Sequence, residues 1–135
     1  MTDNSFDLEC DRLSHVVDDV QFERLRWARH EGPMLARLVE LARGAIAERS
    51  DFELIEEGAS RDEKRFVLKV HSNRICALVL GLNGPQAVVD IQPIDRSRYL
   101  LAPGHPATGD FARVDEAWMA MALRHLFSRI TAAAA

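Results

Sequence analysis

Residues 74–92, RICALVLGLNGPQAVVDIQ, decide the fold. The run from Arg74 to Leu82 is apolar at successive positions, which is typical of a strand that is buried on both faces. Asn83 and Gly84 follow at once, and Asn-Gly between two apolar runs is the strongest short hairpin signal. We therefore predict two antiparallel strands over residues 74–82 and 86–92, the first of them at the centre of a sheet.

Further strands are expected on both sides of this pair. Residues 52–57 alternate in part between apolar and polar, and residues 65–72 are rich in strand-forming side chains. Ser72-Asn73 leaves room only for a tight hairpin. On the other side Pro93 ends or bends the strand because proline has no N–H for the ladder. Residues 97–102 are either a fifth strand or an extension of the fourth, so we predict an antiparallel meander of four or five strands.

Two helices are predicted before the sheet. The first carries apolar residues at helical spacing, interrupted by Arg24: Leu13, Val16, Val17, Val20, Trp27 and Ala28. Alternatively Asp18 or Asp19 caps a shorter helix, and Phe6, Leu8 and Cys10 alternate as a short strand. Gly32-Pro33 predicts the end of one helix and the start of the next, which we expect over residues 33–49.

A last helix is predicted over residues 111–130, with Asp110 as its N-cap. Its apolar residues cover about two thirds of the circumference, whereas a helix on one core needs a stripe of about 100°. A second surface must therefore cover part of it. That surface is either the N-terminal helices of the same chain or the same helix of a second copy.

These elements predict an α+β fold, a two-layer sandwich with two N-terminal helices, the meander sheet, and a C-terminal helix packed on one face. We expect a single domain over residues 1–135, with residues 1–12 and 131–135 as tails.

Composition narrows the class of protein. Of the 135 residues 47% are hydrophobic and 28% charged, which is typical of a soluble globular protein. The net charge of -4 argues against nucleic-acid binding, since that depends on a basic surface. We expect no membrane partner, because no window approaches the roughly 20 apolar residues of a membrane helix. The acidic first fifteen residues do not resemble a secretory signal, so we expect a cytoplasmic protein.

No catalytic, metal-ligating or cofactor-binding residue is predicted. The five histidines lack helical pair spacing, and HExxH, CxxC and GxSxG patterns do not occur. Cys10 and Cys76 are far apart in the chain and are expected to be free thiols. The glycines of residues 81–86 lie between two strands, whereas a phosphate loop runs from a strand into a helix.

The loop over residues 101–110, LAPGHPATGD, is a candidate ligand site. Arg96, Arg98 and His105 lie near the predicted start of the last helix, where free N–H groups favour an anion. The simpler interpretation is that the prolines and glycines only turn the chain, because Asp110 at the cap would repel an anion.

The leading hypothesis is a small non-enzymatic protein-interaction or regulatory module, homodimeric through the C-terminal helix. The basic and aromatic residues 24–32 form no continuous strip for a nucleic-acid backbone. The predicted interface combines residues from both ends of the chain: Phe22, Leu25, Trp118, Met121 and Phe127. The alternative is a protein or enzyme that binds an anionic metabolite at the loop described above.

Overall fold

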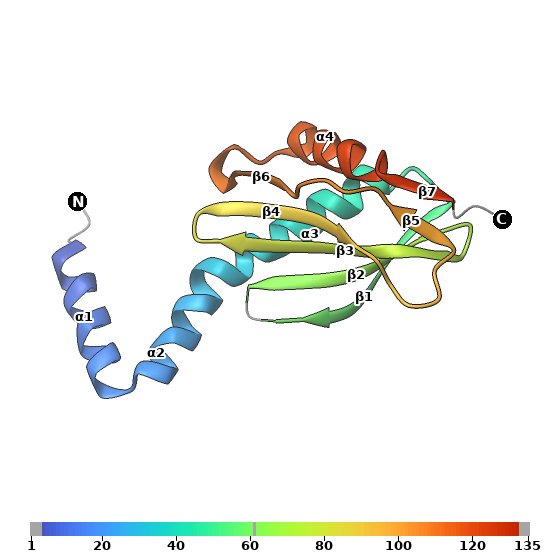
Figure 1. Cartoon of the computed structure of the whole chain (residues 1–135). Helices are drawn as coiled ribbons and strands as arrows, with labels where there is room; N and C mark the ends of the chain where they lie inside the picture. Colours follow the sequence, from blue (N-terminus) through green and yellow to red (C-terminus); the bar gives the residue numbers. More distant parts are fainter. Residues whose placement is uncertain (1–3, 61, 133–135) are drawn as a thin grey trace. The chain divides into compact units, whose positions relative to one another are not determined.

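The computed structural model of the protein describes residues 4–60 and 62–132 (Figure 1). The chain divides into two compact units, Met1–Met34 and Leu35–Ala135. The first unit holds the N-terminal helices, and the second holds the sheet. The expectation of one domain over the whole chain stays a prediction.

In the described part of the chain, the second unit has a five-stranded antiparallel sheet in the order β1-β2-β3-β4-β6. The strands are β1 (Phe52–Ala59), β2 (Glu63–Val70), β3 (Asn73–Asn83), β4 (Gln86–Gln92) and β6 (Ala107–Asp110). β3 is the middle strand, and it is buried without interruption from Ile75 to Gly81. The predicted α+β fold with an antiparallel meander is confirmed.

One face of this sheet carries the core. Phe66, Leu78 and Ile91 are direct neighbours across β2, β3 and β4, and all three are buried. Arg43 of helix α3 (Gly32–Ile46) lies over the Phe66 ring at 5.1 Å and donates a 3.0 Å hydrogen bond to the Leu54 carbonyl. The guanidinium of that arginine thus makes a cation–π contact with the ring and also satisfies a carbonyl of β1.

Helix α4 (Glu116–Phe127) packs on the same face. Trp118 lies against Gly109 of β6, which pairs with Ala87 on the side of the sheet that also carries Ile91. The buried side chains of α4 are Met119, Ala122, Leu123 and Leu126. The predicted packing of the C-terminal helix on one face of the sheet is confirmed.

Polar side chains close the opposite face over β3. Arg65 of β2 donates a hydrogen bond to the side chain of Gln92 in β4. Arg65 pairs with Val79, and Gln92 pairs with Ala77, so this hydrogen bond spans two buried residues of the central strand. A long charged side chain can thus bury apolar surface without a second layer of helices.

Both predicted hairpins are present, each with its loop displaced by one residue. Val70 pairs with Asn73, so the first loop is His71-Ser72, with φ of 49° and 63°. Positive φ at both central residues is the type I′ geometry that matches the strand twist. Asn83 pairs with Gln86, so the second loop starts at Gly84, with φ of 60°.

The strand predicted near residues 97–102 is separate from the fourth strand. β5 (Tyr99–Leu101) pairs with β7 (Ile130–Ala132) in a second, two-stranded sheet of the described chain. β6 lies in the loop for which we predicted only a turn. Its sequence, ATGD, is a poor strand former, and it becomes a strand because the edge of β4 offers unpaired backbone groups.

The predicted helix over residues 111–130 is divided. A 3₁₀ turn, η2 (Phe111–Arg113), comes first, and α4 ends at Phe127. Asp110 accepts a hydrogen bond from the Ala112 N–H, so it caps η2, while Asp115 caps α4 by accepting from the Trp118 N–H at 2.8 Å. Two capping carboxylates explain the division, because a cap marks the start of a helix.

The described residues of the first unit are helical except for Asp18, which is extended. It contains α1 (Asn4–Val17), α2 (Asp19–Arg26) and a π-helical turn, η1 (Trp27–Glu31), which leads into α3. Asp18 caps α2 by accepting from the Gln21 N–H, which confirms one of the two predicted caps. The alternative of a short strand over residues 6–10 was wrong, since these residues lie in α1.

The predicted helix end at Gly32-Pro33 was also wrong. Gly32 keeps helical dihedrals, and its N–H bonds to the Trp27 carbonyl five residues back. A π turn widens the helix and so accommodates Pro33, which lacks an N–H and would crowd an ordinary turn. Gly32 is needed for another reason: a Cβ there would lie 3.2 Å from the Trp27 ring.

The predicted tails are partly described. Residues 4–12 belong to α1, and residues 131 and 132 belong to β7, whereas residues 1–3 and 133–135 lie outside the described residues. No helix in the described ranges has the length and apolar character needed to cross a membrane.

The two thiols should differ sharply in reactivity. Burial raises the pKa of the Cys76 thiol to about 11, whereas Cys10 is exposed. With a thiol-specific reagent at about pH 8 we expect one fast reaction in the native protein and a second only in denaturant, because the thiolate reacts. Cys10→Ser should abolish the fast reaction; fast reaction of both thiols in native protein would contradict the buried position of Cys76.

The β2–β3 turn offers a stabilising substitution. Ser72 has φ of 63°, a region that costs a non-glycine residue about 1–2 kcal/mol and costs glycine little. We expect Ser72→Gly to raise the free energy of unfolding in urea by about 0.5 kcal/mol, after the entropy cost of glycine. Ser50→Gly is the control and should lower stability, because Ser50 is not at positive φ.

Candidate functional site

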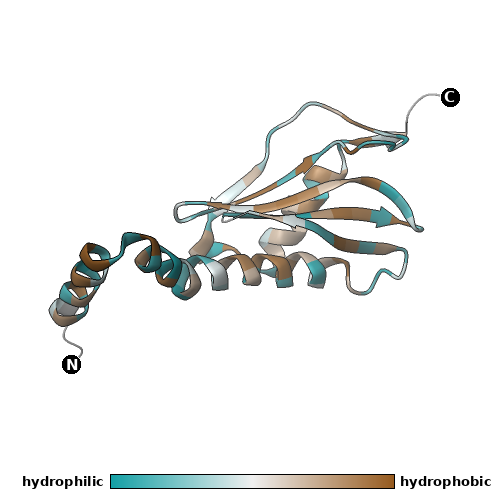
Figure 2. Ribbon diagram, turned by 90° about the horizontal axis from the view of Figure 1, so that it is seen from below, coloured by the Kyte–Doolittle hydropathy of each residue, from teal (hydrophilic) through white to brown (hydrophobic). Residues whose placement is uncertain are grey.

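Exposed apolar side chains gather on the first unit. We define the N-terminal apolar face as the large hydrophobic residues that are 54–76% exposed on α1 and α2: Phe6, Leu8, Leu13, Val16, Val17, Val20 and Leu25. Neither α2 nor η1 buries a residue. In the described part of the second unit, only Leu100 and Met121 are exposed to this extent, and Ile55 is 38% exposed. Figure 2 shows these N-terminal helices with apolar residues in brown between polar residues in teal.

Helical spacing creates much of this face. Phe6, Cys10, Leu13 and Val17 follow one another at intervals of four, three and four residues, which places them on one side of α1. Leu13 and Val17 also belong to the stripe from Leu13 to Ala28 that predicts an amphipathic helix from sequence, and the structure divides that stripe at Asp18. A stripe of this kind normally faces a core, whereas here it faces outward.

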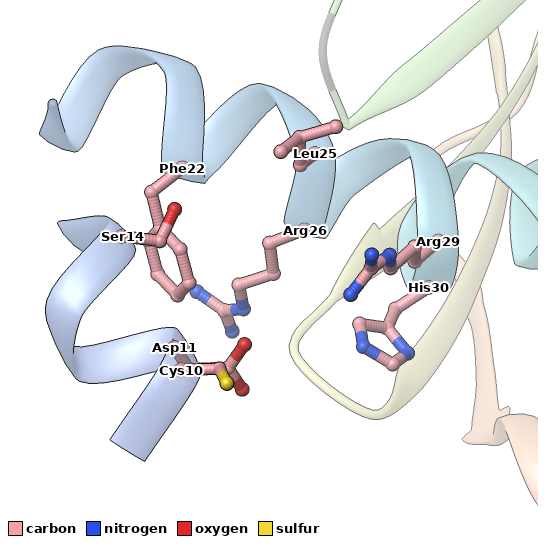
Figure 3. Close-up of a pocket in the computed structure, with 8 residues that line it drawn as sticks. All are labelled: Cys10, Asp11, Ser14, Phe22, Leu25, Arg26, Arg29 and His30. Carbon is pink, nitrogen blue, oxygen red and sulfur yellow. The ribbon is translucent and has the colours of Figure 1, made fainter. Parts of the chain in front are cut away.

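A cavity of about 310 Å³ lies between α1 and the α2–η1 segment (Figure 3). α1 contributes Cys10, Asp11 and Ser14, and the other side contributes Phe22, Leu25, Arg26, Arg29 and His30. Figure 3 shows Arg26, Arg29 and His30 on the side of their helix that faces this space. Two arginines and one aspartate thus line the cavity.

Phe22 is held at the closed end of the cavity. Its ring meets the His15 ring edge to face, with centroids 5.3 Å apart, and it is half-buried. Leu25 is more than half exposed. Both predicted interface residues of this unit thus lie beside exposed apolar surface.

The three predicted interface residues of the last helix have different surroundings. Trp118 is half-buried against Gly109, where a Cβ would come within 2.7 Å of the indole nitrogen. Phe127 is half-buried and packs on Phe52, with ring centroids 6.1 Å apart. Met121 is 63% exposed. Most of the wide apolar arc is thus covered by the second unit itself.

Phe127 also lines a second cavity, of about 320 Å³, at one end of the sandwich. Its walls include Val70, Ile75, Tyr99 and Ile130, from four different strands. This cavity is mainly apolar and opens widely to the surface, and its polar lining residues are His71, Asn73, Tyr99 and Thr131.

The anion site predicted at this loop stays a prediction. Arg96, Arg98 and His105 are exposed. Asp110 accepts a hydrogen bond from the Ala112 N–H at the start of η2, and Asp115 accepts from the Trp118 N–H at the start of α4. Each helix start in this region already carries a carboxylate, which repels a second negative charge.

Contacts of Arg129 account for the path of the backbone at Ala102 and Gly104 without a ligand. Its Nε donates to the Ala102 carbonyl at 2.9 Å, and the Ala102 N–H donates to the Arg129 carbonyl at 2.8 Å. Its guanidinium lies 3.7 Å from the Asp90 carboxylate and directly beneath Gly104. Sequence reasoning missed this residue because its partners are far from it in the chain.

In the portion of the chain that the structure describes, no three His, Cys, Asp or Glu side chains gather where they could hold a metal ion. Comparison of the chain with protein-family models, with curated proteins and with solved structures gives no significant match. The site must therefore be interpreted from its own chemistry.

The contact of Gly104 with Arg129 can be tested by adding one methyl group. A Cβ at Gly104 would lie 2.6 Å from the Arg129 Nε, so we expect Gly104→Ala to lower the free energy of unfolding by about 1–2 kcal/mol. Gly44→Ala is the control: nothing lies within 4 Å, and alanine in helix α3 should raise stability by about 0.5–1 kcal/mol. Equal effects of the two substitutions would contradict the packing of the loop on Arg129.

Proposed function

We propose that the protein is a non-enzymatic association module that binds a second copy of itself through the N-terminal apolar face. The observation that supports this proposal is the exposure of seven large hydrophobic side chains on the described residues of α1 and α2. Apolar surface of this extent usually marks an interface, because its burial is favourable by about 25 cal/mol per Å².

The charges of the first unit favour a protein over a lipid or nucleic-acid partner. α1 carries Asp7, Glu9 and Asp11 beside its apolar stripe. Helices that lie on membranes are rich in lysine and arginine instead. The chain as a whole has a net charge of -4, which disfavours binding to phosphate backbones.

The sequence analysis predicted a homodimer interface on the last helix, whereas the interface proposed here lies on α1 and α2. In the wide apolar arc of α4, the side chains of Met119, Leu123 and Leu126 are buried inside the second unit. Met121 is well exposed. A single exposed methionine supports an interface less than a continuous stripe does. Binding of an anionic metabolite by Arg96, Arg98 and His105 has less support, since carboxylates already occupy the neighbouring helix starts.

Self-association can be measured by sedimentation of the full chain over a wide concentration range. We expect a concentration-dependent dimer, weakened about tenfold or more by Leu13→Gln combined with Val17→Gln, because both side chains lose their apolar contacts. Glutamine keeps a good helix propensity, so helix content should be unchanged by circular dichroism. Met121→Gln is the matched control and should leave the dimer intact.

Two results would overturn the proposal. A chain that stays monomeric up to millimolar concentration does not self-associate. A dimer that Met121→Gln weakens, and that the α1 double variant does not, associates through α4 as the sequence first indicated.

A further inference from the structure

The order of charges along the two N-terminal helical segments suggests how two copies meet. α1 has 14 residues, and α2 and η1 have 8 and 5, so the two segments are nearly equal in length. Asp7 and Glu9 lie in the first half of α1, and Asp11 lies just past its middle. Arg26 and Arg29 lie in the second half of α2–η1, which also holds Glu31, and Arg24 lies just before its middle.

The remaining halves are mixed in charge. Arg12 follows Asp11 in the second half of α1, and Asp19 and Glu23 lie with Arg24 in the first half of α2–η1. If α1 runs antiparallel to an α2–η1 segment, Asp7 and Glu9 lie near Arg26 and Arg29, and Arg12 lies near Glu23. A parallel alignment would instead bring Asp7 near Asp19 and Glu23, and Arg12 near Arg26 and Arg29, which is unfavourable.

The chain's own α1 cannot use this complementarity over its full length. Asp18 is the one residue between α1 and α2, and it is extended, with φ of -158° and ψ of 97°. Two helices that fold back on each other need a connection of about 2–5 residues. The two helices are therefore splayed, and they leave the cavity of Figure 3 between them.

The ion pairs of the described residues agree with a splayed arrangement of α1 and α2. Glu9 pairs with Arg12 at 2.9 Å and Glu23 with Arg26 at 3.5 Å, each within one helix. Asp11 and Arg29 form no ion pair with a described residue. Both line the cavity, where their charges remain available to a partner.

We infer that a second copy binds antiparallel, with α1 of each copy lying along α2 and η1 of the other. The carboxylates of Asp7 and Asp11 from one copy then meet Arg26 and Arg29 of the other, and the same contacts recur by two-fold symmetry. The apolar stripes are then buried in an arrangement of four helical segments, two from each copy, that neither copy forms alone. This inference rests on the proposed function and specifies which part of the second copy completes the cavity.

Two charge-reversed variants test the arrangement. Variant one combines Asp7→Lys with Asp11→Lys, and variant two combines Arg26→Glu with Arg29→Glu. Alone, each brings like charges together at both symmetric contacts, so its dimer should be weaker than wild type by about tenfold or more. An equimolar mixture should form a heterodimer of near wild-type strength, because each reversed helix then meets its opposite.

Three controls distinguish specific charge pairing from a general effect of altered charge or lost helix. Arg98→Glu combined with Arg113→Glu reverses two exposed charges of the second unit and should change neither the dimer nor its behaviour in mixtures. Circular dichroism should show equal helix content in all variants. Raised salt should weaken the wild-type dimer, because exposed charges are screened.

The outcomes are distinct. Weakened variants that do not recover on mixing would overturn the antiparallel arrangement in favour of pairing within one chain or a parallel dimer. Variants that dimerise as tightly as wild type would also overturn it, while the proposed function would still stand if the Leu13 and Val17 substitutions weaken association. A monomeric wild-type chain would overturn both.

Discussion

The row of Phe66, Leu78 and Ile91 across β2, β3 and β4 is the contact on which the second unit depends. These side chains are buried from strand to strand, and α3 and α4 both pack on the face that carries them. Because β3 is paired on both edges and buried along seven successive residues, its register is fixed by burial on both faces. The outer strands and both helices are positioned relative to this strand.

The first unit presents the opposite situation. Its described helices form caps, a π turn and an edge-to-face contact of His15 with Phe22, yet α2 and η1 bury nothing. Helices this short gain most of their stability in water from packing of an apolar face. The exposed stripe on α1 is therefore the basis of the proposed self-association, and the charges of the two segments are the basis of the proposed antiparallel arrangement.

The same physics explains which sequence-based expectations were right. The central strand, both hairpins and the cap at Asp18 depend on neighbouring residues and were predicted. The end of a helix at Gly32 was predicted from local rules and was wrong, because the Trp27 ring and the π turn keep the chain helical there. β6 was missed because its pairing with β4 joins segments separated by a long loop.

The candidate site also combines features that depend on neighbouring residues with features that depend on distant ones. Sequence alone identified an amphipathic stripe from Leu13 to Ala28 and suspected Phe22 and Leu25, because helical periodicity is local. It could not decide whether such a stripe meets a core or solvent, since an apolar pattern is the same in both cases. Only the tertiary structure decided that α4 is largely covered, that Arg129 holds the 102–106 loop, and that the apolar face of α1 is exposed. The physical reason is that burial and long-range hydrogen bonds depend on residues distant in the chain, whereas turns, caps and periodicity depend on near neighbours.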